Sequence, residues 1–250
     1  MYLNTLHLQH FRNYCEQQVE FSAPKTILVG ENAQGKSNLL EAVELLATLR
    51  SHRAVRDREF VQDQEAIAQI TATVQRALST ADLGLTLRSN GRRTVTLNGE
   101  NLKRKADFLG TMNAVQFSSL DLELVRGGPG ERRAWVDTLL IQLEPIYSAI
   151  LEQYNHVLRQ RNALLKQQRS SFGSSSSFGN SASTPIDPTQ MAIWDAQLAA
   201  TGTRVIRRRA RVLARLAHLA QTWHQSISDR REQLAVNYAP NVAMETDDPT

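Results

Sequence analysis

The sequence predicts an α/β fold with an antiparallel β subdomain and a helical arm, and three observations support this. A short apolar run at 26–29 precedes a glycine-containing loop, which is followed by apolar residues at helical spacing over 39–49. The apolar period then changes to two between residues 66 and 97. Beyond residue 145 the apolar residues repeat with alternating spacings of four and three, which is typical of paired helices.

Composition and charge exclude several classes of protein. The 250 residues are 41% hydrophobic and 22% charged, which is typical of a globular chain. The sequence lacks the 18 consecutive apolar residues that a membrane helix requires, and His7 and His10 interrupt any signal-peptide core. Cys15 is the only cysteine, so an internal disulfide is excluded. We therefore expect a cytoplasmic protein with no membrane partner.

The first part of the chain predicts a mixed sheet around one helix. Alternating residues indicate a strand from Leu3 to near Asn13 and a second strand over 18–21. The run at 26–29 is apolar from Ile27 to Val29, as expected of a strand buried on both faces. The helix over 39–49 follows the loop directly, so this segment is half of an α/β unit.

An antiparallel β subdomain is expected next. Period-two patterns predict strands over 67–74, 83–87 and 94–97. The Asn-Gly pairs at 90–91 and 98–99 are strong turn signals. We expect this first region, the N-terminal part of a domain, to cover residues 1–137.

A helical arm over 138–235 follows in the predicted organisation. Its two long helices are expected to pair antiparallel around a disordered, serine-rich insertion at 170–188. Residues 236–250 would then begin a further, incomplete part of the first domain, with a strand starting near 235–238.

The loop between the first buried run and its helix carries a phosphate-binding motif. Residues 30–37, here called the phosphate loop, match the pattern G-x-x-x-x-G-K-[ST] in full. Its glycines allow backbone N–H groups to face a phosphate, Lys36 reaches the β- and γ-phosphates, and the Ser37 hydroxyl binds Mg²⁺. The predicted nucleotide-binding residues are Gly30, Glu31, Asn32, Ala33, Gln34, Gly35, Lys36 and Ser37.

Basic residues are clustered rather than dispersed. The net charge is +4, which alone is weak evidence for a nucleic-acid partner. Each cluster is either a site for a polyanion or a solvated face. The clusters comprise Arg50, Arg53, Arg56 and Arg58; Arg92, Arg93, Lys103, Arg104 and Lys105; and Arg204, Arg207, Arg208, Arg209, Arg211 and Arg215.

Three segments of the sequence resemble the RecF family of bacterial recombination and repair ATPases. They are LHLQHFRNY at 6–14, GENAQGKSNLLEA at 30–42 and LVRGGPGERRAWVD at 124–137. A weaker match is LRQRNALL at 158–165. The resemblance is strong to about residue 165 and looser to about residue 240.

The resemblance implies an ABC/SMC-type ATPase head and an ATP- and Mg²⁺-dependent function. It implies DNA binding in recombinational repair, replication restart and SOS induction, with single-stranded, double-stranded or gapped DNA as partner. It also implies a homodimer formed on ATP binding, and RecR and RecO as partner proteins.

Further site residues are carried over by the resemblance. Arg12 and Asn13 correspond to positions near the nucleotide. Gln116 corresponds to a glutamine that senses Mg²⁺ and the γ-phosphate. The alternative interpretation of Gln116 is a polar residue at the end of a half-exposed strand. Arg53 is either a phosphate- or DNA-sensing arginine or a surface charge. The DNA-binding candidates are Arg53, Arg56, Arg104 and Lys105.

Two motifs of such ATPases are missing from these 250 residues. One is an apolar strand that ends in paired acidic residues (Walker B), and the other is a Leu-Ser-x-Gly signature. We assign no catalytic residue and expect weak DNA-stimulated ATP hydrolysis only of a full-length family member. The alternatives are a non-hydrolysing DNA-binding or dimerisation fragment, and the ATPase subunit of an ABC transporter.

Overall fold

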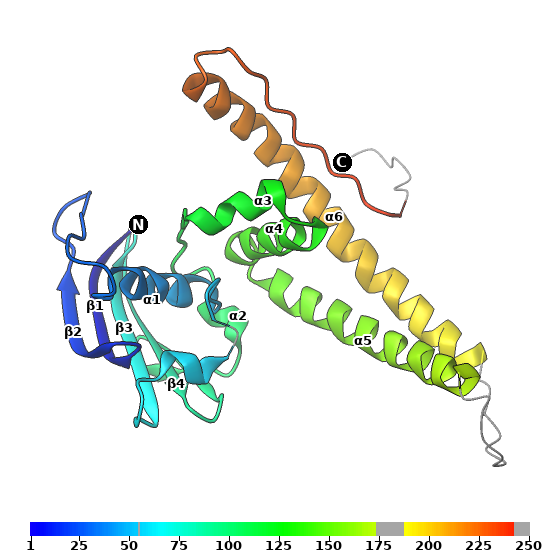
Figure 1. Ribbon diagram of the computed structural model, residues 1–250, viewed down its shortest axis with the longest axis horizontal. Helices are drawn as coiled ribbons and strands as arrows, with labels where there is room; N and C mark the ends of the chain where they lie inside the picture. Colours follow the sequence, from blue (N-terminus) through cyan, green and yellow to red (C-terminus); the bar gives the residue numbers. More distant parts are fainter. Residues whose placement is uncertain (55, 174–187, 243–250) are drawn as a thin grey trace. The chain divides into compact units, whose positions relative to one another are not determined.

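The computed structural model describes residues 1–54, 56–173 and 188–242, and the chain divides into two compact units (Figure 1). The first unit is Met1–Pro145 and the second is Ile146–Thr250. The strands are β1 (Tyr2–Phe11), β2 (Tyr14–Glu20), β3 (Ile67–Gln75), β4 (Thr80–Arg88), β5 (Arg93–Leu97) and β6 (Glu100–Asn101). The helices of the first unit are α1 (Lys36–Thr48), η1 (Asp57–Phe60), α2 (Lys105–Phe108), η2 (Ser119–Leu122), α3 (Glu123–Arg126) and α4 (Pro129–Leu143). The second unit contains α5 (Ile146–Gly173) and α6 (Pro188–Ile227).

The six strands form one sheet in the order β2-β1-β3-β4-β5-β6, and all described neighbours are antiparallel. The three strands predicted between residues 66 and 97 are confirmed, as are both Asn-Gly turns, because Gly91 and Gly99 adopt positive φ. Alternate residues of β3 and β4 are buried, and Ile70 pairs with Leu85 in the buried set. The alternation leaves one face of the sheet apolar.

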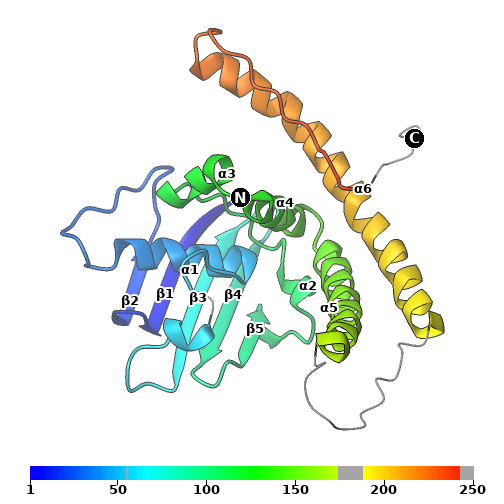
Figure 2. The ribbon, with the colours of Figure 1, turned by 45° about the vertical axis from the view of Figure 1, so that its right-hand side comes forward.

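Helix α1 lies along one face of this sheet (Figures 1 and 2). Its buried residues include Leu39, Leu45 and Leu46, at the helical spacing that the sequence predicts. At the end of β1 the ring of Phe11 stacks on that of Phe60, with 6.0 Å between the centroids. Both rings are fully buried. This packing, together with the hydrogen bond from the Arg12 N–H to the Phe60 carbonyl at 2.8 Å, holds the end of β1 against η1.

The expected strand at 26–29 is wrong. Residues 25–30 form no strand, and Ile27 and Val29 are 85% and 89% exposed. The segment at 114–117 is likewise no strand, with Val115 and Phe117 95% and 90% exposed. An apolar run becomes a strand only beside another strand that satisfies its N–H and C=O groups. None of the described residues provides one here, so the sheet is antiparallel instead of mixed.

Two smaller expectations also need correction. The second strand occupies Tyr14–Glu20 instead of 18–21, because the turn after Phe11 is short and β2 pairs with β1 immediately. Residues 235–238 form no strand in the structure, which shows no neighbouring strand for them among its described ranges.

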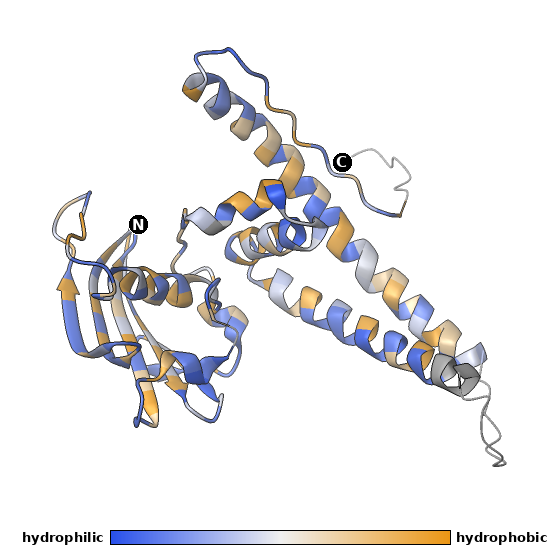
Figure 3. Ribbon diagram, in the orientation of Figure 1, coloured by the Kyte–Doolittle hydropathy of each residue, from blue (hydrophilic) through white to orange (hydrophobic). Residues whose placement is uncertain are grey.

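The second unit is a helical hairpin, shown coloured by hydropathy in Figure 3. Arg161 of α5 donates to Asp195 of α6 at 2.6 Å. Tyr154, seven residues before Arg161 in α5, faces Gly202, which is seven residues after Asp195 in α6. This pairing confirms the antiparallel arrangement. Helix α5 continues to Gly173, into the expected serine-rich insertion, and 174–187 lie outside the described residues.

No helix within the described ranges is both long and apolar enough to cross a membrane.

The Phe11–Phe60 stack leads to a stability prediction. Phe60→Ala should lower the free energy of unfolding by about 3–5 kcal/mol, because it leaves a cavity in the core of the first unit. Phe117→Ala is the matched control, since that ring is exposed, and its effect should be below about 0.5 kcal/mol. Urea unfolding followed by circular dichroism measures both. Similar losses in the two variants would contradict the assignment of Phe60 to the core.

Candidate phosphate-binding site

The phosphate loop ends at the N-terminus of α1. Gly35 precedes the helix with φ of 102°, in a region where glycine is favoured, and α1 has no side-chain cap. The first N–H groups of a helix have no partner within it and carry a partial positive charge. The loop therefore presents uncapped backbone donors at a point where an anion is stabilised.

The Lys36 ammonium lies over the same loop. Its Nζ donates to the carbonyl oxygen of Gly30 at 2.6 Å and to that of Glu31 at 2.5 Å. The lysine thus spans from the start of α1 to the start of the loop. This arrangement gathers the positive charge of the side chain and the helix N-terminus in one place.

Asn13 of the β1–β2 turn and Tyr14 at the start of β2 pack against the loop. A Cβ on Gly35 would lie 2.7 Å from Nδ2 of Asn13 and 2.8 Å from the hydroxyl of Tyr14. Asn38 Nδ2 also donates to Asn13 Oδ1 at 2.8 Å. Only glycine fits position 35 without displacing these side chains. The structure therefore brings Asn13, a predicted site residue, directly to the phosphate loop.

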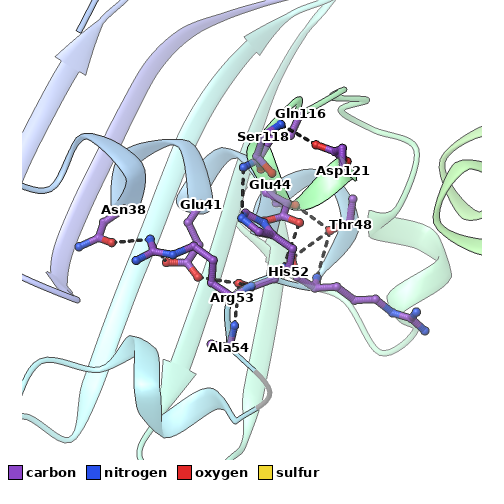
Figure 4. A network of polar contacts seen from close by, with 12 residues as sticks. Asn38, Glu41, Glu44, Thr48, His52, Arg53, Ala54, Gln116, Ser118 and Asp121 are labelled. Atoms are coloured by element: carbon purple, nitrogen blue, oxygen red, sulfur yellow. Dashed lines mark hydrogen bonds and ion pairs between the residues drawn. The ribbon is translucent and has the colours of Figure 1, made fainter. Parts of the chain in front are cut away.

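Glu41 of α1 connects this region through a fully buried carboxylate. Arg12 donates to it twice, from Nε at 3.0 Å and from Nη2 at 2.9 Å. Ser51 Oγ donates at 2.6 Å and Arg53 Nη1 at 3.4 Å (Figure 4). A buried carboxylate is stable only when it is paired and hydrogen-bonded, and Glu41 receives donors from two separate segments, the end of β1 and the loop after α1.

Arg12 and Arg53, both predicted site residues, differ in how many of their guanidinium nitrogens form hydrogen bonds within the protein. Arg12 also donates from Nη1 to the carbonyl oxygen of Glu59 at 2.8 Å and lies over the Phe60 ring at 5.0 Å. Each nitrogen of its guanidinium is therefore bonded within the protein. Arg53 bonds through Nη1 alone, to Glu41 and to Asn38 Oδ1 at 2.8 Å. The geometry makes Arg12 a positioning group and leaves Arg53 partly exposed.

A second carboxylate of α1 links the loop after the helix to Gln116. Glu44 accepts from the His52 backbone at 3.2 Å and pairs with its Nδ1 at 2.6 Å. On the other side of the His52 ring, Gln116 Nε2 lies 3.5 Å from Nε2. Burial raises the pKa of the Glu44 carboxyl, and the contacts with His52 oppose part of that rise.

The remaining DNA-binding candidates lie apart from this network. Arg56 lines an open pocket of about 410 Å³ together with the turn between β4 and β5. Arg104 and Lys105 are exposed at the start of α2, which packs on β5, towards the other edge of the sheet from β2. The structure joins only Arg53 to the phosphate-loop region. The pocket is lined by Arg56, Asp57, Arg58, Ser89, Asn90 and Gly91.

Sequence reasoning missed Glu41, Glu44 and His52. The available signal was that acidic residues three apart share one side of a helix, and that Glu41 lies among apolar residues of α1. A carboxylate at such a position requires a buried cation. Nothing in the sequence indicates that Arg12 supplies it.

Comparison with known proteins identifies one matching family and several similar proteins that share one name. Residues 5–237 match a family described as AAA domain. The DNA replication and repair protein RecF of Nostoc punctiforme is 62% identical over 249 residues, and that of Acaryochloris marina is 59% identical. Each match covers the whole of this chain, and the chain spans 64% of either relative, just under two thirds.

Solved structures show the same fold. A recombination mediator protein RecF-ATP of the RecFOR pathway is 31% identical with a TM-score of 0.78, and its ATPrS counterpart is 30% identical with a TM-score of 0.81. Each covers 91% of this chain, which in turn covers 58% of those chains. The chain therefore has the fold of these RecF structures, with helices beside a β-sheet.

The buried carboxylate of Glu41 can be tested by truncation. Glu41→Ala should lower the free energy of unfolding by about 3–5 kcal/mol, because it leaves the Arg12 cation part-buried without its partner. Glu59→Ala is the matched control, since Arg12 binds only the backbone carbonyl of that residue. Urea unfolding compares the two. Losses of equal size would show that Arg12 does not depend on Glu41.

The raised pKa of Glu44 leads to a pH prediction. Between the ordinary carboxyl value of 4.5 and the raised pKa, the folded chain binds more protons than the unfolded chain. Stability from this group is therefore lost as pH rises through that window. Glu44→Gln should flatten this part of the profile, measured by urea unfolding at several pH values. Glu100→Gln, at an exposed position, is the control. An unchanged slope in Glu44→Gln would contradict the prediction.

Proposed function

Because this chain belongs to the RecF family of AAA-domain proteins, we propose that its phosphate loop binds ATP with Mg²⁺. The observation that carries the proposal is the convergence of Lys36, the uncapped start of α1 and Gly35 on one short loop. The relative of known structure described as RecF-ATP supports ATP as the nucleotide. The loop's backbone N–H groups would surround the phosphates, as the positive end of the helix favours.

Each polar side chain of the site has a role in this proposal. Lys36 would leave the carbonyls of Gly30 and Glu31 for the β- and γ-phosphates, where its charge is better matched. The hydroxyl of Ser37 would hold Mg²⁺, which prefers oxygen ligands. Asn13 would border the nucleotide through its contact with Gly35, and Arg12 would hold the β1–β2 turn in place through Glu41.

Gln116 is the candidate for sensing the metal. Its Oε1 is buried and has no hydrogen-bond partner among the described residues, whereas its Nε2 faces His52. An amide oxygen is a suitable ligand for Mg²⁺ or for a water bound to it. His52, oriented by Glu44, would keep the nitrogen of the amide turned away from the metal.

We further propose that the protein acts on DNA in replication and repair, including recombinational repair, replication restart and SOS induction. Relatives named DNA replication and repair protein RecF, and structures from the RecFOR pathway, support this role. ATP would drive formation of a homodimer, and RecR and RecO would be partners at gapped, single-stranded or double-stranded DNA in the cytoplasm. Arg53 is the candidate that would couple DNA to the nucleotide, since it contacts Glu41 and Asn38 on α1.

The exposed Arg56, Arg104 and Lys105 would contact DNA phosphates on the first unit. Arg56 is the strongest of the three, because its pocket contains a second arginine, Arg58. Contacts with phosphates would give salt-sensitive binding with little sequence preference.

Substitution of Lys36 tests the nucleotide site. Lys36→Ala should weaken ATP binding by about ten- to a hundredfold, because charge-assisted bonds to the phosphates are lost. Lys25→Ala removes the same charge from an exposed position before the loop and should leave affinity unchanged. Titration with a fluorescent ATP analogue in the presence of Mg²⁺ measures both. Unchanged affinity in Lys36→Ala would mean that the loop is structural.

A further inference from the structure

The second unit contains a long helical segment with charge of one sign. Between residues 196 and 227, α6 has no aspartate or glutamate, although it continues for nine turns. Solvated helix faces usually carry both signs, because oppositely charged neighbours stabilise the helix. The six arginines of this segment are Arg204, Arg207, Arg208, Arg209, Arg211 and Arg215.

Four of these arginines form one exposed line, which we call the arginine stripe. Arg204, Arg207, Arg211 and Arg215 are spaced by three, four and four residues and therefore share a face of α6. All four are exposed, and their side chains make no ion pair or hydrogen bond with any residue that the structure describes. Arg209 is different, because it is buried. At 1.5 Å per residue the stripe is about 16 Å long.

Without a bound anion, the four like charges of the arginine stripe repel one another and destabilise α6. Like charges one helical turn apart destabilise a helix by a few tenths of a kcal/mol per pair. An anion that lies along the stripe reverses the sign of this term. Arginine is also suited to phosphate, because its planar group donates two parallel hydrogen bonds.

We propose that the arginine stripe binds the phosphate backbone of double-stranded DNA, and that it does so without nucleotide. This inference rests on the proposed DNA-binding function. A duplex presents about one negative charge per 1.7 Å, so about ten charges match the length of the stripe. The stripe lies in Ile146–Thr250 and includes no residue of the phosphate loop, so its four charges are present whether or not nucleotide is bound.

The composition of the stripe favours a duplex over a single strand. Proteins that hold single strands combine basic grooves with aromatic side chains on which bases stack. Residues 204–215 contain no aromatic residue. The stripe also lies within one continuous helix, α6, so its four charges follow a single line. Contacts of this kind position DNA but do not read its sequence.

A quadruple variant with a matched control tests the proposal. In the stripe variant Arg204, Arg207, Arg211 and Arg215 are replaced by glutamine, which removes the charge but keeps a polar side chain of similar helix propensity. The control replaces four exposed basic residues elsewhere, Lys25, Arg76, Arg230 and Arg231, by glutamine. Both variants lose the same net charge, so long-range attraction falls equally. Circular dichroism checks that each variant is folded.

The measurement is fluorescence anisotropy of a labelled duplex across a salt series, without nucleotide. The stripe variant should lose more than about tenfold in affinity at low salt, and the slope of log affinity against log salt should become shallower by about three to four. The control should keep the slope of the unaltered chain. The same titration with Lys36→Ala should match the unaltered chain, so failure of the ATP site is detected separately by nucleotide titration.

Several outcomes would overturn the proposal. One is a stripe variant that binds the duplex as tightly as the control. Another is a larger loss for a single strand of the same sequence than for the duplex. A third is loss of affinity for polyglutamate with duplex affinity unchanged, which would assign the stripe to an acidic protein.

Discussion

The buried carboxylate of Glu41 is the interaction on which the site depends. It is enclosed completely, so desolvation requires that cations and hydroxyls surround it. Those groups come from the end of β1 and from the loop after α1, which are distant in sequence. Because Arg12 precedes Asn13, the same carboxylate fixes the turn that packs against Gly35. Positioning of the phosphate loop is therefore an electrostatic consequence of a group inside α1.

Helix α1 organises its surroundings through two acidic residues one turn apart. Ser51 and Arg53 bind Glu41, whereas His52 between them binds Glu44. Because residues 51, 52 and 53 bind the two carboxylates in turn, the loop after α1 is held against the helix at both positions. Three features of the site, the phosphate loop, Arg53 and Gln116, thus share one rigid element.

Local patterns were sufficient to predict much of the fold. The phosphate loop, α1 and strands β3 to β5 follow from motif, period and turn residues, which act over a few positions. The strand at 26–29 was wrong because pairing depends on a distant neighbour that an apolar run does not specify. Of the site, the position of Lys36 over the loop was predictable from spacing, and Ser37 as a ligand of Mg²⁺ stays a prediction. Glu41 and His52 were not, because their importance comes from burial against Arg12 and Gln116.

The extended segment at 114–117 couples two kinds of contact. Its exposure alternates: Val115 and Phe117 point outward, while Gln116 turns inward to His52. Any strand that pairs with this segment must fix both sets of side chains at once, since register sets their direction. Strand pairing and a ligand on Gln116 would then favour the same backbone conformation. Each would raise the affinity of the other by the same factor, which is the reciprocity that thermodynamic linkage requires.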